Sequence, residues 1–338
     1  MTITIDPTLQ AQYWGDDAQQ LYDYYPHATR DPYGNPLIIF RHVGGGVGGN
    51  YQTIWTASSR FIMWYFEYVH NTTSLGLHFD IVSVSTAQRQ FDANYLTGKK
   101  TFILGQAQDM QRCIVAMKRL GRIGFGSSNQ YKVDPKRIIL FGESHGSNIC
   151  SLSQLMPPYV ENSMRVQPTY GEAEPGLSTY HRVLSSMDTS NVAGVVYYVG
   201  QPDVRTGCLT YNNLGGFWGA SVTDGGTQLA AVPEQAKRSA STQWYIEQGL
   251  TRFYCPHFVI YPTVSGSKPY SNSHSSQQGV DLAAALAAKN LPYQALNNIN
   301  ESFWLSAGST YHPQLYQWME RTLTAYATAK PSTIGSVV

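Results

Sequence analysis

Short apolar runs alternate along the chain with segments whose apolar residues recur at helical spacing. The runs predict strands at residues 37–40, 77–85, 137–141, 192–199 and 257–261. The helical spacing predicts helices over residues 57–70, from 106 to about 122, over 281–289, and in the segment after Pro313. Strands that alternate with helices are typical of a mostly parallel sheet covered by helices on both faces. We therefore predict a protein of the α/β class.

Two stretches interrupt the alternation, residues 157–190 and 205–250. Both are rich in Gly, Tyr, Thr and Asn, and only one helix is predicted in them, near residues 234–248. Long irregular insertions between strands lie over the strand ends, where lids are found. No internal repeat or low-complexity linker divides the 338 residues, so we expect a single domain over residues 1–338 with a small lid.

The composition excludes several classes of protein. Hydrophobic residues make up 42% of the chain and charged residues 13%, which excludes a disordered chain and a coiled coil. A net charge of +1 lacks the excess of positive charge that is typical of nucleic-acid-binding proteins. The four cysteines form no CxxC pair, which excludes a zinc ribbon or a thioredoxin-like motif and favours free thiols. We find no cofactor fingerprint and no cluster of metal ligands, so we predict neither a cofactor nor a metal.

The N-terminal sequence MTITIDPTLQAQYWGDD lacks the basic and apolar regions of a secretory signal. No run approaches the roughly 18 apolar residues of a membrane span. We therefore expect a cytoplasmic protein, although a mature exported chain whose signal had been removed would look the same. No pattern in the sequence indicates an oligomeric state.

The segment Ile138–Asn148, with the sequence IILFGESHGSN, contains the pattern Gly142-x-Ser144-x-Gly146. An apolar predicted strand precedes this pattern and a helix-compatible stretch follows it. A sharp strand-to-helix turn that exposes a nucleophilic serine needs small residues on both sides of that serine. The turn also directs the helix N-terminus at the negative charge that develops during acyl transfer. The context therefore predicts that Ser144 is a nucleophile.

A glycine-rich segment, RHVGGGVGG, spans Arg41 to Gly49 directly after the first predicted strand. Glycines let backbone N–H groups approach an oxyanion without interference from side chains. A phosphate-binding loop is disfavoured, because the segment contains neither GxxxxGK[ST] nor a GxGxxG that opens a helix. We interpret the segment as an oxyanion loop.

With both motifs, the chain resembles α/β-hydrolases of the esterase and lipase type over about residues 13–325. The glycine-rich segment resembles the HGGG loop of hormone-sensitive-lipase-like esterases, although Val43 separates His42 from the glycines. The segment VDPKRIILFGESHGSN resembles the nucleophile elbow of those enzymes and of type-B carboxylesterases. The resemblance implies a serine esterase that hydrolyses an uncharged small-molecule ester through an acyl-enzyme. It also implies oxyanion donors at the backbone of Gly45 or Gly46 and of His145.

The general base follows the nucleophile and the acid in the family's order. His312 lies in AGSTYHPQ, after the last predicted strand and before the closing helix, where the family keeps its catalytic histidine. We therefore predict His312 as the base. The other histidines downstream of the elbow are His181 in the first insertion, His257 in a strand and His274 in a Ser/Asn-rich loop.

The acid of the triad departs from the family pattern. The family carries Asp in a segment like GTxDxxVP, whereas Ser265 stands at that position in PTVSGSKP. We predict Asp203, in VGQPD after the next-to-last predicted strand, as the acid. The alternatives are Ser265 itself, Asp224, Asp281, Glu301 and an unassisted Ser–His dyad. Two other functions remain open: a serine peptidase or amidase on the same fold, and a non-catalytic binding protein that lost the acid.

Overall fold

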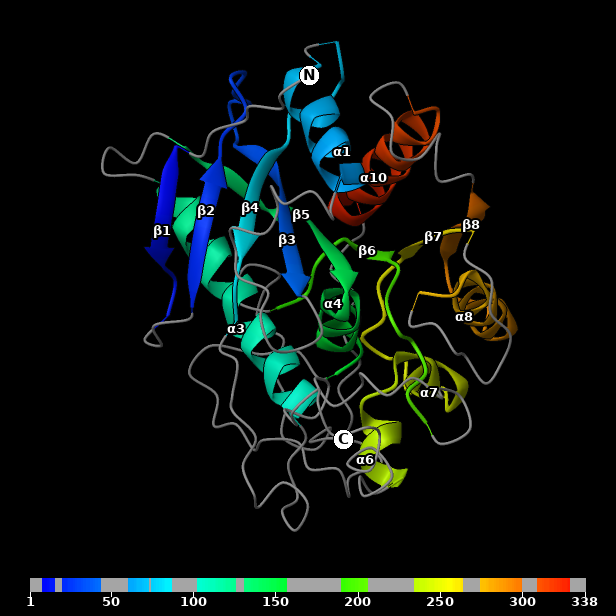
Figure 1. Cartoon of the computed structure of the whole chain (residues 1–338). Helices are drawn as coiled ribbons and strands as arrows, with labels where there is room; N and C mark the ends of the chain where they lie inside the picture. The colour runs from blue at the N-terminus through cyan, green and yellow to red at the C-terminus, as the bar shows by residue number, and fades with distance from the viewer. Residues whose placement is uncertain are drawn as a thin grey trace.

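The computed structural model of the chain describes residues 8–15, 20–43, 60–72, 74–86, 102–125, 131–156, 190–205, 234–263, 274–299 and 309–328. A single eight-stranded sheet in the order β1-β2-β4-β3-β5-β6-β7-β8 crosses the molecule (Figure 1). All neighbouring strands from β4 to β8 in that order pair in parallel, and β2 pairs antiparallel with β1 and β4. The strands are β1 (Leu9–Tyr13), β2 (Leu21–Tyr25), β3 (Asn35–Val43), β4 (Asp80–Val84), β5 (Val133–Ser144), β6 (Gly194–Tyr198), β7 (His257–Pro262) and β8 (Tyr293–Ile299).

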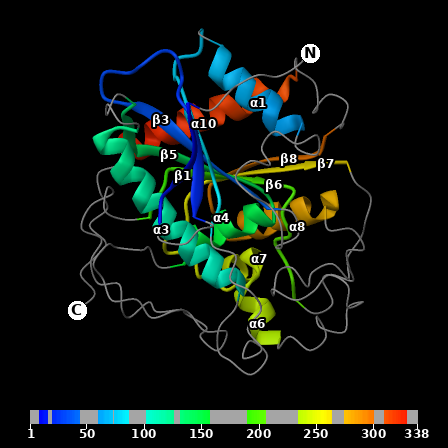
Figure 2. The ribbon, with the colours of Figure 1, turned by 60° about the vertical axis from the view of Figure 1, so that its left-hand side comes forward.

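Helices cover both faces of this sheet. The helices within the described residues are α1 (Arg60–Asn71), α3 (Phe102–Ile123), α4 (His145–Leu155), α6 (Glu234–Ser239), α7 (Thr242–Glu247), α8 (Ser276–Ala288) and α10 (Tyr311–Thr328). Figure 2 shows α1 and α10 over one face, and α3, α4, α7 and α8 over the other. The predicted α/β class, with a mostly parallel sheet between two layers of helices, is confirmed.

The central strands are apolar because both of their faces are buried. In β3, Leu37 and Ile39 join the core cluster that contains residues of α3 and α4, whereas Ile38 and Phe40 join the cluster that contains residues of α1 and α10. All four side chains are fully buried. A parallel strand between two layers of helices therefore has a continuous run of apolar residues, and this run allowed the strand to be predicted from the sequence.

Three features differ from the sequence-based expectations. Strands β1, β2 and β8 were not among the strands predicted from apolar runs, and β8 has the polar sequence YQALNNI. The single helix expected near residues 234–248 is two short helices, α6 and α7. Helix α10 begins at Tyr311, so Pro313 lies within its first turn. The Ser309 hydroxyl accepts a hydrogen bond from the Tyr311 backbone N–H at 3.2 Å, which starts the helix two residues early.

Most of the two predicted lid stretches, residues 157–189 and 206–233, lies outside the described residues.

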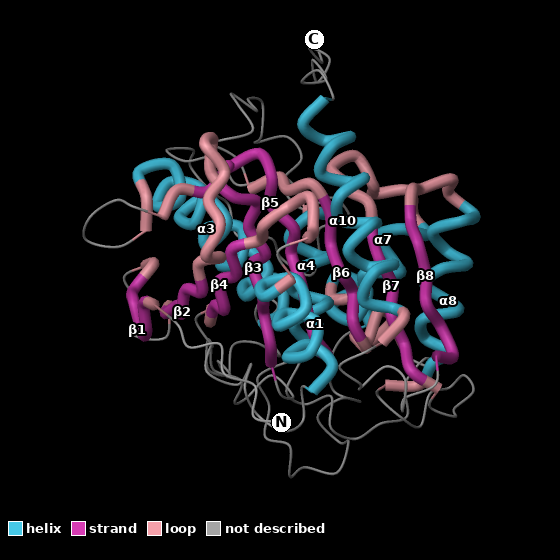
Figure 3. The backbone as a smooth tube through the Cα atoms, turned by 90° about the horizontal axis from the view of Figure 1, so that it is seen from above, coloured by secondary structure: helices cyan, strands magenta, loops and turns pink. Residues whose placement is uncertain are grey.

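The register of β3 and β5 positions the two motifs side by side. Arg41 pairs with Gly142, and Val43 pairs with Ser144 at the carboxyl ends of the two strands. Figure 3, in which the molecule is seen from above, shows β3 and β5 as neighbours at the middle of the sheet. The glycine-rich segment therefore leaves β3 beside the serine that ends β5.

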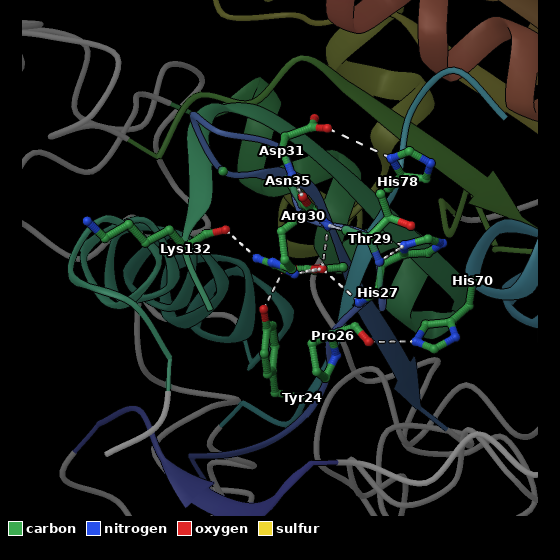
Figure 4. Close-up of polar contacts among 12 residues, drawn as sticks. Tyr24, Pro26, His27, Thr29, Arg30, Asp31, Asn35, His70, His78 and Lys132 are labelled. Carbon is green, nitrogen blue, oxygen red and sulfur yellow. Dashed lines mark hydrogen bonds and ion pairs between the residues drawn. The ribbon is translucent and has the colours of Figure 1, made fainter. Parts of the chain in front are cut away.

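A polar cluster ties the amino ends of the parallel strands together, at the opposite edge of the sheet (Figure 4). The buried Asp80 carboxylate accepts hydrogen bonds from the Tyr24 hydroxyl, from Arg30 Nη1 at 2.6 Å and from Asn35 Nδ2 at 3.0 Å. The backbone N–H of His27 donates to the same carboxylate at 2.9 Å. These bonds join the turn after β2 to the first residues of β3 and β4.

Cys113, Cys150 and Cys255 are buried free thiols. Within the described ranges, no helix is long and apolar enough to cross a bilayer. The same residues include no group of three or more His, Cys, Asp or Glu side chains arranged to hold a metal ion.

Candidate active site

The backbone at Ser144 is strained. Ser144 has φ of 53° and ψ of −125°, a conformation that residues with a side chain rarely adopt. It stands directly before α4, the position from which a serine side chain usually caps the helix N-terminus. Here the Ser144 side chain makes no capping hydrogen bond. The strained turn therefore keeps the hydroxyl available for another partner.

The glycines on either side of Ser144 have no room for a side chain. A Cβ atom on Gly142 would overlap the backbone of Ser147, and one on Gly146 would overlap the carbonyl oxygen of Arg41. The Ser147 hydroxyl donates to the Gly142 carbonyl oxygen at 2.8 Å and holds the turn closed. The glycine spacing in the sequence thus has a steric cause at both positions.

We expect Gly146→Ala to lower the free energy of unfolding by about 2–3 kcal/mol, because the new methyl group must displace the backbone of β3. Thermal unfolding followed by circular dichroism measures this loss. Gly76→Ala is the matched control, since the nearest atom to its new Cβ is the flexible end of the Glu320 side chain. Equal melting temperatures for the two variants would contradict the close approach of α4 to β3.

The partner of the Ser144 hydroxyl is His274. Its Nε2 atom lies 3.0 Å from Ser144 Oγ. His274 immediately precedes Ser275, whose hydroxyl accepts the Gln277 backbone N–H at 3.3 Å and caps α8. Helix α8 follows β7, so its N-terminus lies at the carboxyl edge of the sheet, where β5 ends in Ser144. Burial lowers the pKa of His274 and favours the neutral imidazole, the form that accepts a proton.

His312, the predicted base, does not form the contact expected of it. Its ring packs against Tyr65 and Tyr68 of α1, with centroids 5.6 Å apart in both pairs. The early start of α10 places His312 in the first turn of that helix instead of the preceding loop, over the sheet face that α1 covers. Among the described residues, the histidine that contacts the Ser144 hydroxyl is His274 and not the expected His312.

Asp203, the predicted acid, is held by a neighbouring arginine. Its fully buried carboxylate accepts two hydrogen bonds from the Arg205 guanidinium, at 2.7 Å from Nε and 2.6 Å from Nη2. Arg205 Nη1 also donates to Glu247 of α7 at 2.6 Å. These bonds fasten the segment after β6 to α7.

Two other candidate residues, Asp281 and His257, form hydrogen bonds with residues other than Ser144. The Asp281 carboxylate accepts a hydrogen bond from Gln277 within α8 at 2.8 Å. His257 is fully buried and forms a second serine–histidine pair, with its Nε2 atom 2.8 Å from Ser151 Oγ and its Nδ1 atom 2.8 Å from the Cys255 carbonyl oxygen. Solvent does not reach that pair. Several further candidates lie outside the described residues: Gly45, Gly46, His181, Asp224, Ser265 and Glu301.

His145 begins helix α4 directly after the strained serine. Its backbone N–H is one of the first N–H groups of the helix, which have no partner within it. The ring is buried, and its Nε2 atom lies 3.2 Å from Gln106 Oε1. Burial, and then the charge of Arg41, lower the pKa of the ring to about 3. The ring is therefore neutral at ordinary pH, and only the backbone of His145 is available to an oxyanion beside Ser144.

No protein-family model matches the chain, and no curated protein matches it. Solved structures do. A truncated carbohydrate esterase from gut microbiota is 13% identical with a TM-score of 0.59, covering 96% of this chain and 99% of the other. Esterase B from Lactobacillus Rhamnosis is 14% identical with a TM-score of 0.55, covering 95% of this chain and 87% of the other. A thermophilic esterase from the Planctomycetes species Thermogutta terrifontis is 12% identical with a TM-score of 0.51, covering 94% and 90%. At these identities the likeness shows a shared fold.

Proposed function

We propose that this chain is a serine hydrolase of carboxylic esters with an α/β-hydrolase fold. The observation that carries the proposal is the 3.0 Å contact between the hydroxyl of a strained serine and the imidazole of His274. A serine hydroxyl becomes an effective nucleophile when an adjacent base accepts its proton. The similar solved structures are esterases by name, which supports ester hydrolysis over other acyl transfers.

In the proposed mechanism, Ser144 Oγ attacks the ester carbonyl carbon while its proton passes to His274 Nε2. The carbonyl oxygen becomes an oxyanion held by the backbone N–H of His145 and by that of Gly45 or Gly46. The tetrahedral intermediate then expels the alcohol, which takes the proton from His274 and leaves an acyl-enzyme. Water repeats the sequence on the acyl group, releases the carboxylic acid and restores Ser144.

We assign the base to His274, whereas the sequence predicts His312 in that role. In this assignment Asp203 is a structural residue, whose carboxylate binds the Arg205 guanidinium that also contacts Glu247 of α7. The site then centres on the contact between Ser144 and His274, whose imidazole burial keeps neutral. An uncharged ester fits such a site, since it brings no charge that would need a counter-ion.

The test is hydrolysis of 4-nitrophenyl esters of graded acyl length by the wild-type chain and by Ser144→Ala. We expect wild-type turnover, and in the variant a loss of about 10⁴-fold or more with an unchanged melting temperature. Full activity in the variant would contradict the assignment of the nucleophile. The matching 4-nitroanilides test the amidase alternative: faster cleavage of the anilide than of the ester would favour it. No cleavage of either would favour the non-catalytic alternative.

A further inference from the structure

One buried hydroxyl, that of Ser147, joins three elements beside the candidate nucleophile. Ser147 lies in the first turn of α4 and is inaccessible to solvent. Its Oγ atom lies 2.8 Å from the Gly142 carbonyl oxygen of β5 and 2.8 Å from the Tyr198 carbonyl oxygen of β6. The same Oγ atom accepts a hydrogen bond from the Tyr198 backbone N–H at 3.1 Å. The hydroxyl therefore ties the first turn of α4 to both strands that lie beside it.

These bonds enclose the strained residue Ser144. Gly142 lies two residues before Ser144 and Ser147 lies three residues after it, so the bond between Gly142 and Ser147 closes a short loop that contains Ser144. Ser144 has φ of 53°, and a rotation to the usual negative φ would swing the two flanks of this loop apart and break that bond. A strained conformation persists only where the surrounding structure fixes it. The Ser147 hydroxyl supplies such a constraint.

The partner of Ser147 on β6 is itself held in place. Tyr198 pairs with Glu143 of β5. The next residue, Val199, has φ of 47°, which is rare for a residue with a branched Cβ atom. The Val199 backbone N–H donates to the Ile260 carbonyl oxygen of β7 at 3.0 Å. The end of β6 is therefore held from both sides, and Ser147 is bonded to a fixed point of the sheet.

Ser144 has a competing conformation. It stands directly before α4, whose first backbone N–H groups have no partner within the helix. A serine in this position usually adopts extended φ and ψ and accepts one of these N–H groups through its hydroxyl. That conformation would bring Ser144 Oγ to the helix N-terminus and away from His274 Nε2, from which it lies 3.0 Å. Because the two partners require different backbone conformations, the hydroxyl either caps α4 or contacts the base.

We propose that Ser147 is a positioning residue whose hydroxyl holds Ser144 in its strained conformation and so keeps the Ser144 hydroxyl on His274 instead of on the N-terminus of α4. This inference rests on the proposed function and extends it. Without the Ser147 hydroxyl, Ser144 relaxes into the capping conformation in most molecules, and only the remainder can attack an ester. The loss appears in kcat and leaves KM nearly unchanged, because the buried Ser147 does not contact the ester.

The experiment compares Ser147→Ala with Ser153→Ala as the matched control. Ser153 is a second buried serine of α4, and its hydroxyl donates to the Cys150 carbonyl oxygen within the same helix at 2.7 Å. Both variants should melt at a lower temperature than the wild type, because each loses a buried hydrogen bond. We expect Ser147→Ala to lower kcat by about 10- to 100-fold with KM within about twofold, and Ser153→Ala to keep kcat within about twofold. Equal kcat in the two variants would overturn the inference.

A double-mutant cycle with His274→Gln tests whether Ser147 acts through the contact between Ser144 and His274. That contact to the base is already lost in His274→Gln, so adding Ser147→Ala should change kcat by less than about twofold. A further loss of about tenfold or more in the double variant would overturn the inference.

If Ser147→Ala does not fold, Ser147→Cys decides. Its thiol keeps the shape of the side chain but is a weak hydrogen-bond donor, so we expect kcat to fall by at least about threefold, and full kcat would overturn the inference. A wild-type chain that hydrolyses no ester would refute the proposed function itself. An active wild type with full kcat in Ser147→Ala would overturn this inference alone.

Discussion

Replacing His274 with glutamine should lower kcat for a short aryl ester by about 10⁴-fold, the scale seen when one member of a catalytic triad is disabled. Glutamine keeps a polar side chain of similar length but cannot accept the Ser144 proton as a base. The hydroxyl then stays un-ionised, and only binding and the oxyanion donors still favour the reaction. The loss should appear in kcat and kcat/KM alike, because the proton transfer occurs only in the transition state. Steady-state kinetics at saturating ester measure it.

His312→Phe is the matched control for this prediction. Phenylalanine preserves the ring contacts with Tyr65 and Tyr68 and removes both ring nitrogens. We expect this variant to keep kcat within about threefold of the wild type, since His312 contributes to packing. The opposite ranking, with His312→Phe inactive and His274→Gln active, would return the base to the position that the sequence favours.

The protein should lose stability steeply as the pH falls from about 6.5 to about 4. Burial lowers the pKa of five histidines, those of His257 and His312 to about 4 and that of His145 to about 3, and those of His27 and His274 in the same direction. His27 lies with its ring 4.7 Å from that of His78 and 5.6 Å from that of His70, which adds like-charge repulsion to burial (Figure 4).

The sign follows from the linkage between protonation and folding. The unfolded chain binds protons at these rings near pH 6.5, whereas the folded chain resists them, so stability is present above pH 6.5 and is lost on acidification. A shift from 6.5 to about 4 is worth about 3 kcal/mol for each of His257 and His312, a large part of the stability of an ordinary domain.

Urea unfolding at several pH values between 7.5 and 4 measures this loss. His312→Phe again supplies the control, because it removes one of the titrating rings. We expect its unfolding free energy to fall less between pH 6.5 and 4 than that of the wild type. A free energy that stays constant over this range in the wild type would contradict the buried, neutral state of these histidines.

The strand-to-helix turn at Ser144 could be predicted from the sequence because its constraints are local. The strand ends in a serine with positive φ, and the helix begins at the next residue. This arrangement requires glycine two positions before and two positions after the serine. The steric overlaps that a Cβ atom would cause at Gly142 and Gly146 explain why both positions are glycine. Strands β3 to β7 were predictable for a similar reason, since burial on both faces leaves a continuous apolar run. Strand β8 was not, because its sequence YQALNNI has no such run.

The histidine that contacts Ser144 could not be predicted from its position in the sequence, because this contact depends on which chain segments meet at the carboxyl edge of the sheet. His312 and His274 both precede or begin helices at that edge. The capping interaction of Ser309 extends α10 through His312 and turns its ring toward α1. The capping interaction of Ser275 starts α8 one residue after His274 and leaves that ring outside the helix, beside Ser144. The run His-Ser-Ser-Gln-Gln was the signal for this helix start.

The most direct test of the account is covalent labelling with a fluorophosphonate probe, followed by mass spectrometry of the labelled peptide. Such a probe phosphonylates a serine only when a base activates its hydroxyl, so labelling reports on the Ser144–His274 pair without any choice of ester. We predict one phosphonate per wild-type chain, located at Ser144, with rapid labelling in His312→Phe and labelling at least 100-fold slower in His274→Gln. No label at Ser144 in the wild type, or equal labelling rates in the two variants, would contradict the account.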